Sequence, residues 1–539
     1  MTRALRLVVL LSVVAACGFA RATGEPPAQH AASPAAAARP TLVVFFTVDQ
    51  FRGAYLSRYG AQFRSGLKRL LDGGAVFANG MHDHAITETA PGHASTMSGR
   101  FPVHTGIIMN SQGVNTREFP LLNAAQGPGA APNRFVGTTL TDWMVAADRD
   151  TRVLSVSRKD RGAILPIGRS KQQVFWYASD GEFVTSTWYM DQLPAWVNAF
   201  NGERAPQKHA GAVWRLLRPE GEYPEPDAVP TEGRGRDFTF PHVAPADSDA
   251  AAATYPNYPV MDSLTLAFAL RGVEAMKLGS AGSRTDLLAV SLSTLDAVGH
   301  RYGPDSREVH DHLLRLDRYL GQFLDALFKM RDSTRIIFAM TGDHGVTPFP
   351  GVTLYDDNRS AKVVSLDSVA QGMAERMKAA GLEPAKAFSW EDGVLVVDPA
   401  YLRAARLNTD SLVEAFAASA RRVPGVWRVD RMRDLAGADS VHDAITRRWL
   451  HMFDPARTNV QLVVTLEKWS VWSLGNIAMH GSPHDNDANV PILFMGAPFT
   501  RGVFADTVRV VDMAPTLAQV LGLKPSEKLD GRVLTQAIR

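Results

Sequence analysis

Two pairs of carboxylate and imidazole side chains stand in separate parts of the sequence, Asp296 with His300 in STLDAVGHRYG and Asp343 with His344 in AMTGDHG. Each pair follows an apolar, β-prone run, residues 287–292 and residues 336–340, which predicts two strands of a buried parallel sheet. Ligands bind beyond the carboxyl ends of such strands, so the pairs are expected to meet there. One Asp-His pair alone would more often be a solvated turn. Two pairs in this arrangement predict the site of a two-metal hydrolase.

The second pair needs a turn. Asp343 and His344 are adjacent, so on a regular strand they would point to opposite faces, and only a turn just past the strand lets both face one ion. Gly342 and Gly345 are expected to supply that turn.

Three further segments carry candidate side chains. Asp49 follows the apolar strand predicted over residues 41–48. Thr89 lies just ahead of a helix in which Pro91 suits the first position, where free N–H groups favour an anion and a metal would hold the hydroxyl. His480 and His484 precede another apolar strand, and one of them is expected to complete a three-residue ligand set. Taken singly, Asp49 and Thr89 would be ordinary cap residues.

The content and order of these motifs resemble the alkaline phosphatase superfamily, and within it the bacterial alkaline phosphatases with a threonine nucleophile, relatives of the nucleotide pyrophosphatase/phosphodiesterases. The resemblance extends from about residue 40 to the carboxyl terminus and includes the closing segments VVDMAPTLAQVLGL and LDGRVL. It implies an α/β fold, an alkaline-phosphatase-like three-layer α/β/α sandwich with a central, mostly parallel sheet and inserted cap segments.

The resemblance also implies a cofactor and its ligands. Two Zn²⁺ ions per chain are expected, one bound by Asp296, His300 and His480, the other by Asp49, Asp343 and His344 together with Thr89. His484 competes with His480 as the third ligand of the first ion. Carboxylate oxygens and imidazole nitrogens suit zinc. One ion would activate the Thr89 hydroxyl and the other would neutralise the leaving alkoxide, so the reaction would pass through a phosphothreonine.

Substrate choice depends on Asn110, Lys159 and Arg161. Asn110 in MNSQ matches both the phosphatase and the phosphodiesterase branches, so it indicates a phosphoryl oxygen without choosing between monoester and diester. The segment KDRGAILP resembles the monoesterase branch, where Lys159 and Arg161 contact the non-bridging phosphate oxygens. A monoester dianion offers these cations two terminal charges and a diester only one. Small phosphate monoesters are therefore the expected substrates.

Two other functions stay open from the sequence. The same scaffold serves phosphodiesterases and nucleotide pyrophosphatases, and the basic loop around Lys159 would then be a solvated surface. A non-catalytic binding lipoprotein that retains the fold is the second alternative. His82 and His84, although spaced like metal ligands, and His93, on the helix after Thr89, are expected to be framework or packing residues.

Length and composition are those of a large folded enzyme. The 539 residues are 45% hydrophobic with a formal net charge of +2, which favours one elaborated domain and gives no reason to expect a nucleic-acid partner. Residues 39–539 form the predicted catalytic domain, after an Ala/Pro-rich linker over 23–38. Insertions are expected at about 201–257, over the site mouth, and at about 354–454, as an α+β lobe with a helix over 366–380 and a strand over 393–397.

The amino terminus predicts export. Arg3 and Arg6 precede an apolar run over residues 7–16 that is too short for a permanent membrane span, so residues 1–22 are interpreted as a signal peptide. Cys17, the only cysteine, ends VAAC, which resembles a bacterial lipoprotein processing site, and ARA at 20–22 offers the ordinary cleavage alternative. The protein is expected to be periplasmic or secreted, with a lipid anchor at Cys17 as its one route to a membrane.

Overall fold

The central strand of the protein is β1 (Leu42–Val48), seven apolar or β-branched residues that are all buried. In the computed structural model, which describes residues 39–122, 128–352, 354–356, 358–473 and 478–539, alternate side chains of β1 enter two cores. Val44 and Phe46 belong to one core, Val43 and Phe45 to the other. A strand buried on both faces requires a layer of helices on each. The predicted signal peptide, the linker and Cys17 lie outside the described residues.

Ten strands of the described chain form the central sheet, in the order β19-β2-β18-β11-β1-β10-β5-β6-β7, with β20 paired to β2. Around β1 the strands are parallel: β10 (Asp286–Leu292), β11 (Ile336–Gly342), β5 (Val153–Ser157) and β6 (Gln173–Tyr177). The others are β2 (Ala75–Met81), β7 (Phe183–Val184), β18 (Asn489–Met495), β19 (Gly502–Phe504) and β20 (Val508–Arg509). The three strands predicted over 41–48, 287–292 and 336–340 are present, with ends shifted by one or two residues.

The register aligns the carboxyl end of β1 with those of its neighbours. Val48 lies opposite Leu292 of β10 and Gly342 of β11, so the residues that follow these three strands leave the sheet at one edge. β18 is antiparallel to β11 and β2, so its amino end lies at that same edge. A residue before β18 can therefore meet residues that follow β1, β10 and β11.

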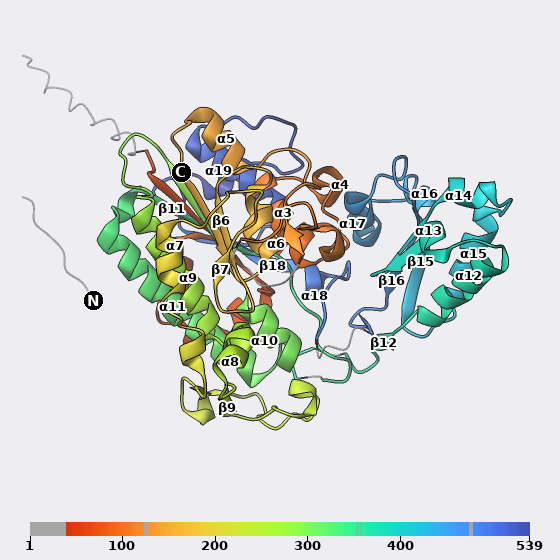
Figure 1. The fold of residues 1–539 in the computed structure, drawn as a ribbon, viewed down its shortest axis with the longest axis horizontal. Helices are drawn as coiled ribbons and strands as arrows, with labels where there is room; N and C mark the ends of the chain where they lie inside the picture. The colour runs from red at the N-terminus through yellow and green to blue at the C-terminus, as the bar shows by residue number, and fades with distance from the viewer. Residues whose placement is uncertain (1–38, 123–127, 353, 357, 474–477) are drawn as a thin grey trace, which may run out of the picture. The chain divides into compact units, whose positions relative to one another are not determined.

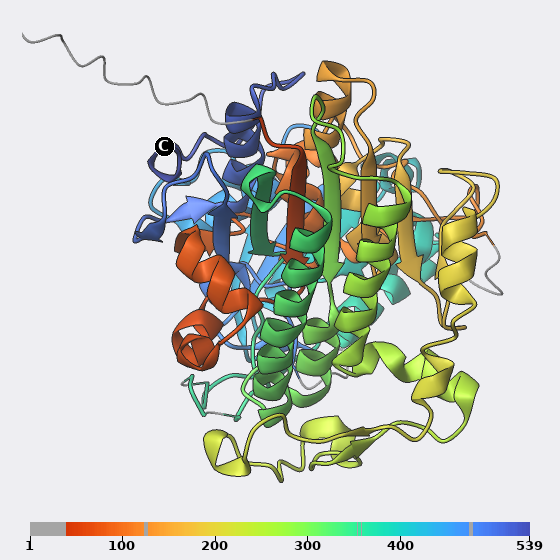
Figure 2. The same ribbon diagram turned by 90° about the vertical axis from the view of Figure 1, so that its left-hand side faces the viewer.

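Helices cover both faces of the sheet. α2 (Gly66–Gly73), α9 (Val260–Ala275) and α11 (Arg307–Met330) pack into the core that contains Val44 and Phe46, and Figure 2 shows α9 and α11 side by side across that face. α3 (Thr89–Ser98), α5 (Leu140–Ala147), α6 (Asp160–Ile164) and α19 (Met513–Leu521) pack into the opposite core (Figure 1). The layers confirm the predicted α/β class. No helix among the described residues is long and apolar enough to cross a membrane.

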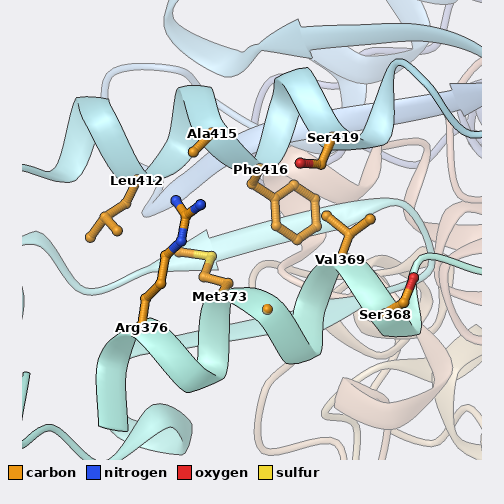
Figure 3. Close-up of a pocket in the computed structure, with 9 residues that line it drawn as sticks. Ser368, Val369, Met373, Arg376, Leu412, Ala415, Phe416 and Ser419 are labelled. Carbon is orange, nitrogen blue, oxygen red and sulfur yellow. The ribbon is translucent and has the colours of Figure 1, made fainter. Parts of the chain in front are cut away.

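A smaller α+β lobe has a sheet of its own, in the order β13-β14-β16-β15, from β13 (Phe388–Glu391), β14 (Val394–Val397), β15 (Val426–Arg431) and β16 (Val460–Leu466). Helices α12 (Asp367–Ala379) and α15 (Thr409–Ala420) share a core with this sheet (right side of Figure 1). Between the two helices lies a pocket of about 200 Å³ (Figure 3). Arg376 is the only ionisable residue among those that line the pocket, so the pocket offers no group of side chains suited to catalysis.

Two chain segments that lead into and out of the lobe are joined by a β-bridge. The chain leaves the central sheet after β11, builds the lobe, and returns before β18. Thr347 on the outgoing segment and Met479 on the returning one pair in an isolated β-bridge, with reciprocal N–H to carbonyl bonds of 2.8 and 3.2 Å.

Residues 201–257 fold into short elements, among them α8 (Ser248–Thr254) and the 3-10 helices η6 (Glu232–Gly235) and η7 (Tyr255–Asn257). η6 and η7 pack against α10 (Thr294–Tyr302). The segment therefore lies next to the helix that carries Asp296 and His300.

Candidate active site

One cluster of ligand atoms forms where β1 and β11 end. Asp49 directly follows β1, and Asp343 and His344 directly follow β11, so the aligned ends of two neighbouring strands deliver all three side chains. Their ligand atoms lie within 4.8 Å of one another, and the three residues are fully buried. A buried group of two carboxylates and one imidazole suits a divalent cation such as zinc.

A second cluster joins α10 to the segment before β18. Asp296 and His300 are four residues apart on α10, so they share one face, with Asp296 Oδ1 3.1 Å from His300 Nε2. His480 completes this cluster, its Nε2 3.2 Å from His300 Nε2. His484 lies elsewhere, since its Nε2 donates to the Leu466 carbonyl at 2.9 Å. Of the two candidates before β18, the structure brings His480 to the cluster.

The hydrogen bonds of the three clustered histidines fit metal binding. The Nδ1 atoms of His300, His344 and His480 face backbone carbonyl oxygens at 2.7, 2.8 and 2.9 Å. A carbonyl oxygen can only accept, so each Nδ1 carries the proton and each Nε2 lone pair is left for a cation. Two such lone pairs, on His300 and His480, face each other at 3.2 Å, an arrangement that a cation between them stabilises.

The carboxylates fit a cation for the same reason. Asp49 Oδ1, Asp49 Oδ2 and Asp343 Oδ2 are buried and accept no well-aligned hydrogen bond from any described residue. The Asp49 carboxylate has only ionic contacts with Lys159 and His344, at 2.6 and 3.3 Å. Buried carboxylate oxygens without such bonds are costly unless a cation balances them. The two clusters thus have the donor types and the unpaired acceptors of metal sites.

Thr89 is the first residue of α3, with Glu88 as the N-cap. The helix therefore begins two residues earlier than expected: Pro91 is its third residue, where the missing N–H still costs no helical bond. Thr89 is buried, with its Oγ1 3.5 Å from His344 Nε2. Gly92 permits this approach, because a Cβ there would lie 2.1 Å from the Asp343 carbonyl oxygen.

Lys159 lies between the two clusters. It follows β5, and its Nζ is 2.6 Å from Asp49 Oδ2, 2.7 Å from Asp296 Oδ2 and 3.2 Å from Thr89 Oγ1. The side chain is only 7% exposed. One ammonium thus reaches both clusters and the Thr89 hydroxyl.

Asn110 and Arg161 are placed less directly. The Asn110 Oδ1 accepts from the Ala90 N–H at 2.9 Å, which holds the amide at the amino end of α3 with its Nδ2 as a donor. Arg161 lies in α6 with 29% of its side chain exposed, and it forms an ion pair with Asp160 at 3.6 Å. The structure brings Asn110 to the helix end that carries Thr89, but it gives Arg161 no contact with Thr89 or with either cluster.

The buried carboxylates are held in the ionised form. Burial and Asp296 raise the pKa of Asp49, but Lys159 and His344 outweigh them and keep it well below its usual range. Burial also raises the pKa of Asp296, and Lys159 and His300 reverse that effect. Both carboxylates are thus charged at neutral pH.

The two central histidines differ in charge. Burial lowers the pKa of His344, but the charges of Asp343 and Asp49 outweigh burial and raise the pKa to about 9. Burial, together with His344 and His300, holds the pKa of His480 well below its usual range. Without a cation His344 is therefore protonated near neutral pH, whereas His480 is neutral.

Gln50 is a site residue that the sequence did not reveal. Its N–H donates to Asp343 Oδ1 at 3.0 Å and its Nε2 to Asp296 Oδ1 at 3.1 Å, so one residue orients a carboxylate in each cluster. It has a positive φ of 66°. A Cβ on Gly299 would lie 1.8 Å from Gln50 Oε1, so the glycine makes room for this side chain. The position after Asp49 was the only signal that could have indicated it.

His93 is buried on α3 with its Nδ1 3.1 Å from Asp343 Oδ2, so it packs against a clustered carboxylate. His82 and His84 bond to each other at 3.3 Å and belong to neither cluster. Gly342 and Gly345, which were expected to supply the turn after β11, flank Asp343 and His344 without a positive φ. They instead allow close packing, since a Cβ on Gly345 would lie 2.3 Å from the Asn486 carbonyl oxygen.

Comparison with known proteins confirms the resemblance drawn from the motifs. The family profile described as type I phosphodiesterase / nucleotide pyrophosphatase matches residues 43–462. The alkaline phosphatase PhoV of Synechococcus elongatus is 29% identical over 99% of this chain and 100% of its own, and the alkaline phosphatase PhoK of a Sphingomonas species is 31% identical over 93% of this chain and 91% of its own. The crystal structure of the alkaline phosphatase PafA matches with a TM-score of 0.84 and 27% identity, covering 94% of this chain and 100% of that one. The chain therefore belongs to the type I phosphodiesterase/nucleotide pyrophosphatase family and, within it, to the alkaline phosphatases.

Proposed function

We propose that the chain is an exported alkaline phosphatase that binds two zinc ions and hydrolyses phosphate monoesters through a phosphothreonine at Thr89. The residues that would hold the ions are the two clusters, Asp296, His300 and His480 for one and Asp49, Asp343 and His344 for the other. Thr89 would be a further ligand of the second ion, as its distance of 3.5 Å from His344 supports.

The position of Lys159 carries this proposal. Its ammonium contacts a carboxylate from each cluster and the Thr89 hydroxyl, so a phosphoryl group on Thr89 would meet a fixed positive charge. A monoester has two charged non-bridging oxygens in the ground state and gains most from such a cation. Burial raises the pKa of Glu88, the N-cap of α3, and Arg161, on the first turn of the helix that follows Lys159, is near enough to oppose that rise, so it adds a second positive charge on this side. These cations favour a monoester over a diester.

The protein's own groups account for the steps. Zinc, when bound, would lower the pKa of the Thr89 hydroxyl and balance the charge of the leaving oxygen. The amino end of α3 presents Thr89 where backbone N–H groups favour an anion. Lys159 and the Nδ2 of Asn110 donate to non-bridging oxygens. The Thr89 hydroxyl gives its proton to solvent and its oxygen attacks phosphorus, while the other P–O bond breaks with its electron pair on the leaving oxygen, which takes a proton from water and departs as the alcohol. Water then hydrolyses the phosphothreonine, which restores the hydroxyl and releases phosphate.

Export rests on the amino-terminal sequence alone. The apolar run over residues 7–16 after Arg3 and Arg6 supports a signal peptide and hence a periplasmic or secreted protein. Cleavage after ARA would release the chain, and processing at Cys17 would anchor it to a membrane by lipid. Mass spectrometry of the mature amino terminus separates the two.

The test of the function is metal analysis combined with two rates on the same sample. We expect two zinc ions per chain, rapid hydrolysis of 4-nitrophenyl phosphate, and slower hydrolysis of bis(4-nitrophenyl) phosphate, which has the same leaving alcohol. Faster hydrolysis of the diester would favour the phosphodiesterase alternative. Failure of the zinc-loaded protein to turn over either ester would favour the non-catalytic alternative.

A further inference from the structure

A pocket of about 490 Å³ opens beside the cluster formed by Asp296, His300 and His480. Asp296 and His300 form one wall. Arg158, Arg234, Arg301 and Asn257 are among the residues that complete it, and the 201–257 segment contributes two of these four. Asp296 and His300 therefore belong both to the pocket wall and to the candidate metal cluster.

The pocket has an excess of positive charge. Arg158 donates from Nε to the Ser293 carbonyl at 2.9 Å and lies 3.5 Å from Asp296, which fixes its guanidinium at the wall. Arg301 is paired with Asp237 at 2.7 Å. Asp296 would be engaged by a metal, so it contributes little negative charge to the pocket.

Arg234 is the cation without a counter-ion. It is exposed in η6, has a positive φ of 58°, and forms no ion pair with any described residue. The nearest acidic neighbour in sequence, Glu232, is buried, and burial together with Glu308 and Asp227 raises its pKa to about 10. Glu232 is therefore neutral at physiological pH and does not cancel the charge of Arg234.

The position of the pocket indicates which part of a substrate it would receive. Thr89 lies beside the Asp49, Asp343 and His344 cluster, so an in-line displacement at phosphorus puts the leaving oxygen on the side of the other cluster. The pocket begins at Asp296 and His300 of that other cluster. The alcohol part of the ester would therefore extend into the arginine-lined space.

We propose that this pocket selects phosphate monoesters whose alcohol carries a second anionic group, a carboxylate or another phosphate, and that Arg234 is the residue that determines this preference. The inference rests on the proposed function, because it places the leaving alcohol on this side of the phosphorus. Arg158 and Arg301 supply the background charge, and Arg234 binds the second anion because no carboxylate of the described chain competes for it.

The test compares two esters with one carbon skeleton. 3-Phosphoglycerate has a carboxylate where glycerol 3-phosphate has a hydroxymethyl group. We expect a higher kcat/KM for 3-phosphoglycerate, and Arg234→Gln should reduce this preference by roughly threefold to fivefold, the scale of one solvent-exposed charge pair. The rate with glycerol 3-phosphate should not change. Added salt should weaken the preference in the parent chain, because an exposed pair is screened.

Arg236→Gln is the matched control, since Arg236 is exposed two residues further along the same segment and does not line the pocket. It should leave both rates unchanged. Propane-1,3-diyl bisphosphate, compared with propyl phosphate, shows whether a second phosphate is preferred as well as a carboxylate. Equal kcat/KM for the paired esters in the parent chain, or equal losses for both in Arg234→Gln, would overturn the inference.

Calorimetric binding to the Thr89→Ala variant separates this inference from the proposed function. Tighter binding of 3-phosphoglycerate than of glycerol 3-phosphate, lost on adding Arg234→Gln, supports the pocket even if the parent chain hydrolyses neither ester. Hydrolysis of both esters without any dependence on Arg234 would reject the pocket and leave the phosphatase function in place.

Discussion

Lys159→Ala is the most informative single substitution, because it removes the one charge that touches both clusters and Thr89. The side chain is 7% exposed, so solvent cannot replace its ammonium, whereas Arg161 is 29% exposed and partly screened. Loss of a charged donor in a buried, preorganised site costs about 2–4 kcal/mol of transition-state stabilisation. That corresponds to a fall of about 30-fold to 900-fold in kcat/KM for a monoester.

Two substrates and two positions distinguish a direct role of Lys159 from a structural one. Arg161→Ala should lower kcat/KM for the monoester by about tenfold, a smaller loss than in Lys159→Ala, because the Arg161 guanidinium contacts neither cluster. Hydrolysis of bis(4-nitrophenyl) phosphate should fall by less than about tenfold in both variants, since a diester has one fewer charged oxygen. Steady-state rates with 4-nitrophenyl phosphate and its diester on one zinc-loaded preparation provide the assay.

Zinc content must be measured alongside, because Lys159 also balances Asp49 and Asp296. Lys68→Ala is the control, since Lys68 is an exposed lysine paired with Asp72 on α2. Equal losses for monoester and diester at full zinc occupancy would show that Lys159 only stabilises the buried carboxylates. The monoesterase assignment would then fail.

Further expectations concern the nucleophile and the metals. Thr89→Ala should abolish acid-trapped phosphoprotein and lower turnover by orders of magnitude, with Thr89→Ser partly active; a parent-like rate in Thr89→Ala would make Thr89 only a helix residue. Chelation should abolish activity and lower Tm, zinc should restore both, and activity that survives complete chelation would refute a metal mechanism. His480→Ala should lower zinc stoichiometry and His484→Ala should not; the reverse result would reject the assignment of His480. The pKa of His344 is raised to about 9, so below that pH its proton competes with zinc for the imidazole. The zinc affinity of the metal-free protein should therefore rise about tenfold per pH unit from pH 7 to 9 and level off above pH 9. A zinc affinity that does not change with pH would contradict this prediction.

Local patterns predicted the part of the fold that builds the sheet edge. Apolar runs that end in Asp49 and in Asp343 with His344 became adjacent parallel strands, because strands buried on both faces are apolar throughout. Asp296 and His300 are four residues apart, a spacing that puts both side chains on one face if the segment is a helix. The structure shows that it is one, α10.

The undecided points depended on long-range contacts. His480 and His484 both precede β18, and only the contacts of His480 Nδ1 with the Thr87 carbonyl and of His484 with Leu466 distinguish them. Gln50 could not be recognised, because its role requires carboxylates from two other segments. Arg234 lies in a segment without periodicity, so no sequence pattern placed it beside Asp296.

The bridge between Thr347 and Met479 bears on how this enzyme can evolve. The bridge holds together the two segments that lead into and out of the lobe, so a change in lobe length need not displace His344 or His480. Closing a longer loop is inexpensive, about 0.6 kcal/mol for each doubling of its length. The lobe also contacts the body elsewhere, through the apolar patch of Val394 and Met109 and through the ion pairs of Arg447 and Arg448 with Asp83. Related chains are therefore expected to vary in the parts of the lobe far from these contacts, while the residues that meet the body and the chemistry at the sheet edge stay unchanged.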